Sequence, residues 1–228
     1  MPVNETNYNE IIAECKSRNV RLVAVSKIQT VEDIKKLYDL GQRDFGENYV
    51  QELVEKQALL PADIKWHFIG HLQSNKVKFI APFVHLIHGV DTVKLLNEIN
   101  KQAKKLNIII HCLLQVHIAD EETKFGFDEN ELKELMIALQ ASPHKFENIF
   151  IEGLMGMASF SNNIEKVRGE MRFLKTLFNY FSSFETFNCK MSILSMGMSG
   201  DYKIAIEEGS NLVRIGSLLF GARPPKAI

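Results

Sequence analysis

Short apolar runs alternate with longer amphipathic stretches along the whole chain. The runs are rich in β-branched residues and too short to form helices of their own, which favours buried strands. They are centred near residues 22, 45, 67, 87, 113, 153, 195 and 214. The stretches between them carry apolar residues at helical spacing, as Ile34, Leu37 and Leu40 do. The pattern therefore predicts eight strands that alternate with helices.

Capping residues and glycines indicate where these elements begin and end. Thr30 precedes one helix and Gly41 ends it, and Asp91 and Ser199 stand where two further helices begin. We expect strands at 21–27, 44–45, 65–70, 85–90, 107–118, 150–157, 193–198 and 211–220. We expect helices at 7–18, 31–40, 50–60, from 74 onward, and at 93–106, 130–139, 164–181 and 202–208.

Eight strand–helix units are what a closed (β/α)8 barrel of the TIM type requires, so we expect a single α/β domain over residues 1–228. The pattern shows no helix after the last strand, and the extra amino-terminal helix could take that place in the outer ring. A doubly wound open sheet is the alternative, but no Gly-x-Gly-x-x-Gly turn follows the first strand.

Composition narrows the class of protein. With 46% hydrophobic and 24% charged residues and a formal net charge of −1, the chain lacks the basic field that draws in nucleic acid or an anionic membrane. The odd number of cysteines, Cys15, Cys112 and Cys189, fits a reduced compartment. The first residues lack the regions of a signal peptide, and no apolar run approaches ~20 residues. We therefore expect a cytoplasmic protein.

Lys27 is the first candidate for chemistry. It follows the apolar run Leu22–Val25, at the carboxyl end of the first strand, and ligands bind outside the carboxyl ends of strands in parallel α/β folds. The alternative is that Lys27 is simply the first solvated residue of a loop.

A candidate phosphate site lies near the end of the chain. Ser199 and Gly200 precede a short helix, whose free N–H groups and a serine hydroxyl could hold an anion, and Gly200 lets the backbone approach a ligand. Gly216 and Ser217 follow the last strand, and the loops after strands seven and eight are a frequent phosphate site in such barrels. Ser199 could also do no more than cap its helix.

A lysine at one strand end and a phosphate cradle across the mouth together indicate pyridoxal 5′-phosphate (PLP), whose aldehyde forms a Schiff base with lysine. Arg214 is the one arginine placed to approach the pyridine nitrogen. Because arginine does not readily accept a proton, that nitrogen would stay unprotonated and PLP would be a weak electron sink. A structural ion pair is the alternative role for Arg214.

Histidines do not indicate a metal site. His67 and His71 are four apart, but on a strand followed by a turn this spacing does not put both rings on one face, and we expect no metal. Lys124 lies in a loop segment after strand five, and its chemistry alone assigns it no role.

Several motifs in order resemble the pyridoxal phosphate homeostasis proteins, the YggS/PROSC-type PLP-binding family. They are Ala24-Val25-Ser26-Lys27, Phe45-Gly46-Glu47-Asn48-Tyr49-Val50-Gln51-Glu52, Trp66-His67-Phe68-Ile69-Gly70-His71-Leu72-Gln73-Ser74-Asn75-Lys76, Gly153-Leu154-Met155, Ser195-Met196-Gly197-Met198-Ser199-Gly200-Asp201 and Arg214-Ile215-Gly216. The resemblance covers essentially the whole chain and implies the barrel of the alanine racemase amino-terminal domain, of PLP fold-type III.

The resemblance also implies roles for individual residues. Lys27 would be the Schiff-base lysine and Arg214 the neighbour of the pyridine nitrogen. The phosphate contacts would be Ser199, Gly200, Gly216 and Ser217, and the pocket wall would include Asn48 and Met155.

The expected function depends on the absence of a second domain. Racemases and decarboxylases of this fold carry a second, mostly β domain that contributes a catalytic group from a partner subunit, whereas this sequence ends with the barrel. We therefore expect a non-catalytic, monomeric carrier that holds PLP on Lys27 and releases it to apo-enzymes through transient contact. An amino-acid racemase that uses the same lysine as its base is the alternative. A phosphate-binding barrel enzyme without PLP is a third hypothesis.

Overall fold

The computed structural model describes residues 3–119 and 125–221, and its centre is a closed barrel of eight parallel strands. The strands follow one another around the barrel in chain order, and β8 pairs with β1 to close it. They are β1 (Arg21–Val25), β2 (Asp44–Glu47), β3 (Lys65–Phe68), β4 (Leu86–Val90), β5 (Ile110–Val116), β6 (Ile149–Gly156), β7 (Cys189–Ser195) and β8 (Leu212–Ile215). The predicted (β/α)8 barrel is confirmed.

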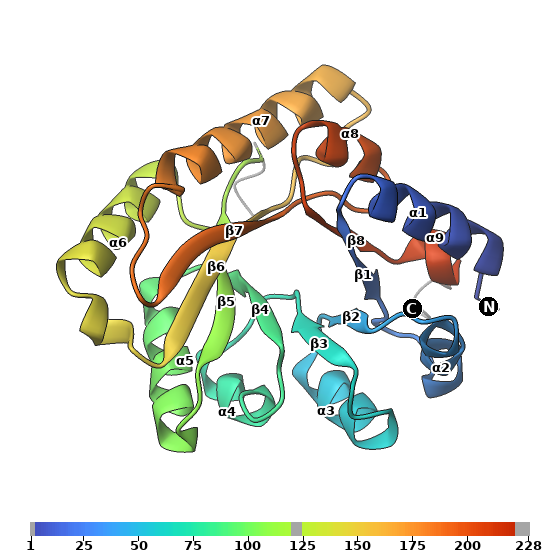
Figure 1. The fold of residues 1–228 in the computed structure, drawn as a ribbon, viewed down its shortest axis with the longest axis horizontal. Helices are drawn as coiled ribbons and strands as arrows, with labels where there is room; N and C mark the ends of the chain where they lie inside the picture. Colours follow the sequence, from blue (N-terminus) through green and yellow to red (C-terminus); the bar gives the residue numbers. More distant parts are fainter. Residues whose placement is uncertain (1–2, 120–124, 222–228) are drawn as a thin grey trace, which may run out of the picture.

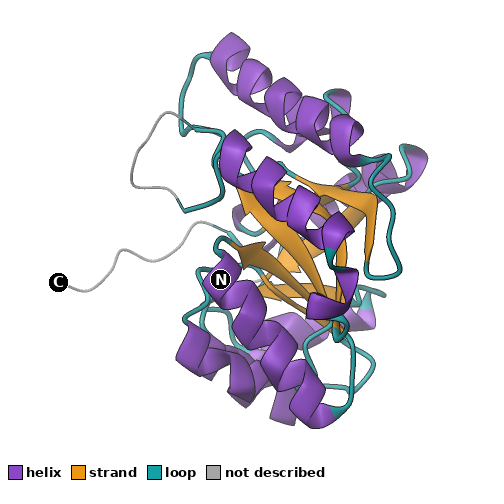
Figure 2. Ribbon diagram, turned by 90° about the vertical axis from the view of Figure 1, so that its left-hand side faces the viewer, coloured by secondary structure: helices purple, strands orange, loops and turns teal. Residues whose placement is uncertain are grey.

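Helices form the outer ring (Figure 1) and cover the strands on their outer side (Figure 2). The α-helices are α1 (Glu5–Ser17), α2 (Val31–Asp39), α3 (Val50–Leu59), α4 (Val77–Ile80), α5 (Val93–Leu106), α6 (Glu129–Ala141), α7 (Ile164–Phe181), α8 (Tyr202–Glu207) and α9 (Ser217–Phe220). Two short 3-10 turns, η1 (Ser74–Lys76) and η2 (Pro143–Phe146), precede α4 and β6.

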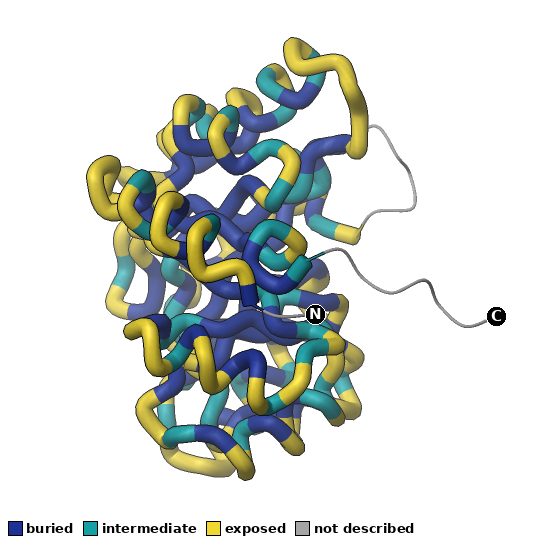
Figure 3. The backbone as a smooth tube through the Cα atoms, turned by 90° about the vertical axis from the view of Figure 1, so that its right-hand side faces the viewer, coloured by how far each residue is buried: buried dark blue, intermediate teal, exposed yellow. Residues whose placement is uncertain are grey.

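The apolar core has two parts. The larger part lies between the strands and the inner faces of the helices, where Phe45, Ile34 and Leu37 are fully buried. The smaller part fills the lumen of the barrel with one side chain from each of six strands: Val23, Leu86, Leu113, Met155, Ile193 and Leu212. Figure 3 shows the result, with buried strands at the centre and exposed outer helix faces. Burial on both sides explains why the middle of strands such as β1 and β5 is a run of apolar residues.

The predicted strand at 211–220 was wrong in its second half. β8 ends at Ile215, and the next residues form the short helix α9. Helix α1 lies beside α9 (Figure 1), where the Asn4 N–H donates to the Leu219 carbonyl at 2.8 Å and Asn7 Nδ2 donates to the Leu218 carbonyl at 3.0 Å. The barrel therefore does have a final helix, and α1 packs against it.

Two of the predicted helix caps were also wrong. The Thr30 side chain accepts from the Asp33 N–H, as expected, but the cap of α5 is Thr92, which accepts from the Leu95 N–H at 3.2 Å. Asp91 instead contacts His71. At α8 the cap position is Asp201, two residues after Ser199.

Among the described residues, no helix is long and apolar enough to cross a bilayer.

Candidate functional site

The ends of β1, β7 and β8 meet at the carboxyl-terminal mouth of the barrel. Ser199 Oγ accepts a hydrogen bond from the Gly216 N–H at 3.3 Å, which joins the loops after β7 and β8. A Cβ added at Gly216 would lie 3.2 Å from both Cβ and the carbonyl oxygen of Val25, the last residue of β1. Lys27 follows Val25 by two residues and is partly buried. The predicted lysine and phosphate residues therefore belong to one mouth.

A buried ion-pair network holds the turn that carries Lys27. Lys56 Nζ, from α3, donates to the Ser26 carbonyl at 2.7 Å and to Glu47 Oε1 at 2.8 Å. The Ser26 hydroxyl donates to the same Glu47 oxygen at 2.6 Å. Lys56, Glu47 and Ser26 are all buried, so the residue before Lys27 is fixed from both its backbone and its side chain.

Glu52 fixes the residue after Lys27. Its Oε1 accepts from the Ile28 N–H and from Lys56 Nζ, both at 2.5 Å. Ile28 has φ +67°, a conformation that is costly for a β-branched residue and persists only where surrounding contacts enforce it. Lys27 thus sits in a strained turn whose two flanking residues are both hydrogen-bonded to the network.

Burial raises the pKa of the Glu47 carboxyl, and the charge and hydrogen bond of Lys56 and the Ser26 hydroxyl partly offset this rise. Glu47 Oε2 is buried and has no hydrogen-bond partner among the described residues. The carboxyl is therefore held mainly through its other oxygen.

Arg214 lies inside the barrel near the mouth and is buried. Its Nη1 donates to the Ser195 carbonyl at 2.9 Å and to Ser195 Oγ at 2.5 Å, and its Nη2 donates to the Gly156 carbonyl at 3.0 Å. Burial lowers the pKa of this guanidinium to about 10. The structural ion pair considered as an alternative is wrong, since within the described residues these hydrogen bonds go to carbonyl and hydroxyl oxygens.

The proposed phosphate contacts differ in how the protein uses them. Gly200 is exposed, and a Cβ added there would meet no atom within 4 Å. Ser199 is partly buried and already bonded to Gly216, whereas Ser217 is exposed at the start of α9. The helix-cap alternative for Ser199 is wrong, because its hydroxyl joins the two loops instead.

The two predicted wall residues lie at different depths. Asn48 follows β2, and its Oδ1 is buried without a hydrogen-bond partner in the described part of the chain. Its backbone packs against Gly70, where an added Cβ would lie 2.5 Å from the Asn48 carbonyl oxygen. Met155 is fully buried in the lumen, next to Ser195 across the β6–β7 pairing. Met155 is therefore part of the floor, and Asn48 offers an unsatisfied acceptor at the rim.

His71 and Asp91 form a further polar pair at the ends of β3 and β4. His71 Nδ1 lies 2.9 Å from Asp91 Oδ2, and its ring stacks on Phe125 with centroids 4.0 Å apart. The sequence analysis missed this contact, because Asp91 also fits a helix cap and His71 was considered only as a metal ligand.

The residues that hold Lys27 and Arg214 were missed as well. Lys56 and Glu52 have the spacing of an ordinary solvated helix pair, so their burial gives no signal in one sequence. Ser195 looks like any small residue in an apolar strand. Lys124 lies outside the described residues.

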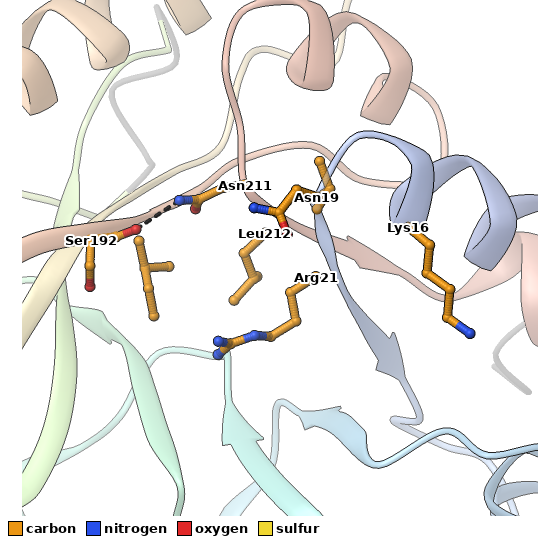
Figure 4. A pocket seen from close by; sticks show the side chains of 8 residues that line it. Lys16, Asn19, Arg21, Ser192, Asn211 and Leu212 are labelled. Atoms are coloured by element: carbon orange, nitrogen blue, oxygen red, sulfur yellow. Dashed lines mark hydrogen bonds between the residues drawn. The ribbon is translucent and has the colours of Figure 1, made fainter.

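A polar hollow occupies the opposite end of the barrel (Figure 4). It has a volume of about 400 Å³ and is lined by Lys16, Asn19, Val20, Arg21, Ser192, Ile193, Asn211 and Leu212. Asn211 Nδ2 donates to the Ser192 carbonyl across it at 2.7 Å. Because it lies at the amino-terminal ends of the strands, it is not the predicted cofactor site.

Asp44, His67 and His85 have potential ligand atoms within 4.8 Å of one another at this same end. Both ring nitrogens of His67 are already engaged, Nε2 with Asp44 Oδ1 and Nδ1 with His88 Nε2, each at 2.9 Å. Arg21 and Lys65 also act on His67, and such positive charges oppose a bound cation. We therefore describe these residues as part of a hydrogen-bonded chain.

Known proteins resemble this chain over nearly its whole length. A family model described as alanine racemase, N-terminal domain, matches residues 4–224. A pyridoxal phosphate homeostasis protein of Aquifex aeolicus is 42% identical over 204 residues, which cover 89% of this chain and 87% of that protein. Another, from Schizosaccharomyces pombe, is 38% identical over 222 residues, covering 95% and 90%.

Solved structures agree with the sequence relatives. PipY of Synechococcus elongatus, solved with PLP bound, superposes with a TM-score of 0.82 at 32% identity and covers 93% of this chain and 99% of its own. An alanine racemase of Clostridium difficile superposes with a TM-score of 0.73 at 17% identity, which shows a shared fold. On the family model, the sequence relatives and the barrel together, this chain belongs to the pyridoxal phosphate homeostasis protein family.

Proposed function

We propose that this chain binds pyridoxal 5′-phosphate at the carboxyl-terminal mouth, holds it reversibly as a Schiff base on Lys27, and releases it to apo-enzymes. The main support for the proposal is that the carboxyl ends of three strands meet at one mouth of the barrel. The turn of Lys27, the Ser199–Gly216 contact and the buried Arg214 all belong to the ends of β1, β7 and β8.

The residues present fit the cofactor. PLP supplies an aldehyde that condenses with an amine, and a phosphate that accepts hydrogen bonds. Lys27 would provide the amine, and the open backbone at Gly200 leaves room for a group to approach the loop more closely than any side chain would allow. Asn48 Oδ1 is buried without a hydrogen-bond partner among the described residues, so the Asn48 side-chain amide has unused hydrogen-bonding capacity at the rim.

Arg214 would make bound PLP a weak electron sink. A guanidinium donates hydrogen bonds and does not readily accept a proton, so it would keep the pyridine nitrogen unprotonated. An unprotonated ring withdraws electrons weakly, which gives little stabilisation to a substrate carbanion. The likeness in fold to alanine racemases makes a racemase the second candidate.

We further propose a cytoplasmic monomer that contacts its recipient enzymes transiently. The three cysteines are buried thiols, which suits a reducing compartment. Large apolar side chains are exposed in several loops, where a partner could cover them. Ile28, Tyr49, Phe160 and Met198 follow β1, β2, β6 and β7, and Phe125 precedes α6.

The absorbance spectrum of the protein purified without added cofactor tests the proposal. We expect a band near the visible edge in the wild type and its loss in Lys27→Ala, with Lys35→Ala on exposed α2 as the matched control. The PLP-loaded protein should transfer PLP to an apo-enzyme and should not racemise alanine. A colourless wild type refutes PLP binding, and racemisation that depends on Lys27 refutes the carrier.

A further inference from the structure

A continuous chain of hydrogen bonds crosses the lumen of the barrel from Arg214 to the opposite end. Ser195 Oγ, at the end of β7, lies 3.1 Å from His88 Nδ1 on β4, which is not a neighbouring strand. His88 Nε2 lies 2.9 Å from His67 Nδ1 on β3, and His67 Nε2 lies 2.9 Å from Asp44 Oδ1 on β2. The Nη1–H of Arg214 donates to Ser195 Oγ at 2.5 Å. The path thus joins side chains of β2, β3, β4 and β7 to Arg214 on β8.

The charge at one end fixes the position of every hydrogen along this path. Burial raises the pKa of Asp44, but the hydrogen bond from His67 and the charges of Arg21 and Lys65 outweigh it, so the carboxyl is ionised and accepts. His67 therefore carries its proton on Nε2. Burial lowers the pKa of His67, so its ring is neutral, and a neutral imidazole has one donor and one acceptor; His67 Nδ1 must therefore accept.

The same step repeats toward the mouth. His88 must donate from Nε2 to His67, and since burial keeps the pKa of His88 well below its usual value, its Nδ1 accepts. The Ser195 hydroxyl must then donate to His88, which leaves the Ser195 oxygen to accept from Arg214. All the bonds point the same way, from the guanidinium at the mouth to the carboxylate at the far end.

The direction of these hydrogen bonds stabilises the buried positive charge of Arg214. A buried cation is costly unless groups around it supply compensating charge, and no carboxylate within the described residues pairs with it directly. Hydrogen bonds in a chain polarise one another, so the ionised Asp44 makes His67, His88 and Ser195 successively better acceptors. Asp201 offsets part of the cost of burying Arg214, and the polarised chain would add to this offset through the lumen.

We propose that Asp44, His67, His88 and Ser195 are positioning residues for Arg214, a one-way hydrogen-bonded chain that orients its guanidinium toward the ring nitrogen of the bound cofactor. The orientation of Arg214 toward the ring nitrogen rests on the proposed function. The charged and titratable groups that face the chain are Arg21, Lys65 and His85 at the Asp44 end and Asp201 at the Arg214 end.

The chain itself is tested without cofactor, by 15N NMR of the histidine rings in the apo-protein. We expect His67 and His88 to be neutral, each with its proton on Nε2, and to remain so from pH 6 to pH 8. In Asp44→Asn the amide can donate as well as accept, so we expect this single tautomer to be lost at both histidines. A proton on Nδ1 of either ring in the wild type overturns the chain, whatever the cofactor result.

The effect on the cofactor is tested with 15N-labelled PLP bound to the wild type, Asp44→Asn and Ser195→Ala. We expect both variants to shift the ring-nitrogen resonance and to weaken PLP binding by about tenfold, the loss of roughly one charge-assisted hydrogen bond. Borohydride trapping on Lys27 should persist. His111→Gln removes a contact with Glu152 at the same end of the barrel and is the control. It should change neither the ring-nitrogen resonance nor the affinity for PLP.

The outcomes separate the two proposals. If the wild type binds no PLP, the proposed function fails while the apo-protein spectra still decide the chain. If PLP binds but the ring-nitrogen resonance is the same in wild type and Asp44→Asn, the positioning role is refuted and the proposed function stands.

Discussion

Gly200 is a residue whose identity the packing of the protein does not explain. It is exposed, its φ is outside the left-handed region, and an added Cβ would meet no atom within 4 Å. Gly216 differs, because a Cβ there would press on Val25 at 3.2 Å. A glycine that the fold does not need, beside Ser199 and Gly216, is what a phosphate that approaches the backbone would require.

Gly200→Val tests this directly. We expect PLP binding to weaken by about tenfold, since the side chain would occupy the approach to the loop, while the free energy of unfolding changes by less than about 0.5 kcal/mol. PLP titration followed by absorbance and urea denaturation measure the two quantities.

Gly169→Ala, in the middle of α7, is the matched control, because a Cβ there also meets no atom within 4 Å. It should stabilise the protein by about 1 kcal/mol through helix propensity and leave PLP binding unchanged. Equal PLP affinity in Gly200→Val and the wild type would contradict a phosphate at this loop.

At the scale of elements, helix α3 determines the shape of the Lys27 turn. Lys56 connects Ser26, Glu47 and Glu52, and removing one partner from a buried ion pair leaves an uncompensated charge. We expect Lys56→Met to cost about 3–5 kcal/mol of stability. We also expect it to slow formation of the borohydride-reducible adduct on Lys27, because the strained turn at Ile28 would relax.

Lys35→Met on α2 removes a lysine from an exposed ion pair with Asp39 and serves as the control, with an expected change below about 1 kcal/mol. Urea denaturation and stopped-flow absorbance after PLP addition follow both variants. If Lys56→Met were as stable and as reactive as Lys35→Met, the network would not position Lys27.

The elements themselves were largely predictable from the sequence. Burial on both faces makes strands such as β1 short apolar runs, and α7 was predicted at its observed bounds because its apolar residues recur at helical spacing. Errors arose where two readings share one local signal. Ser217–Phe220 is too short for a helical period to appear, and Asp91 and Thr92 are both good caps.

The sequence could place Lys27, Ser199 and Arg214 at one mouth because residue type and strand end coincide there; their roles toward PLP stay predictions. Contacts that join distant strands carry no local signal. His88 and Ser195 are 107 positions apart, and Lys56 on its helix face looks like any solvated lysine. These partners are brought together by the closure of the barrel. Hydrophobic periodicity predicts that a barrel forms but not which side chains face one another inside it.

For the whole molecule, the buried histidines predict a dependence of stability on pH. Burial lowers the pKa of His67 and of His88 below the value of about 6.5 that each would have in the unfolded chain. Below pH 6.5 the unfolded state therefore binds protons that the folded state does not, so the stabilisation present above this pH is lost as the pH falls. We expect these two histidines together to contribute a loss of about 2–4 kcal/mol between pH 7 and pH 5.

Urea denaturation at pH 5, 6 and 7 measures this loss. In His88→Leu one of the two histidines is gone, and the loss should shrink by about 1–2 kcal/mol. His144→Gln, at an exposed position in η2, should keep the slope of the wild type. A slope that His88→Leu leaves unchanged would mean that His88 does not stay neutral in the folded protein.

The central claim is that PLP binds covalently to Lys27. The most direct measurement is borohydride reduction of the PLP-saturated protein, followed by proteolysis and mass spectrometry of every lysine-containing peptide. We expect one stoichiometric phosphopyridoxyl group, on the peptide that contains Lys27, and only weak, scattered labelling in Lys27→Ala. Stoichiometric labelling of a different lysine, or none in the wild type, would contradict the claim.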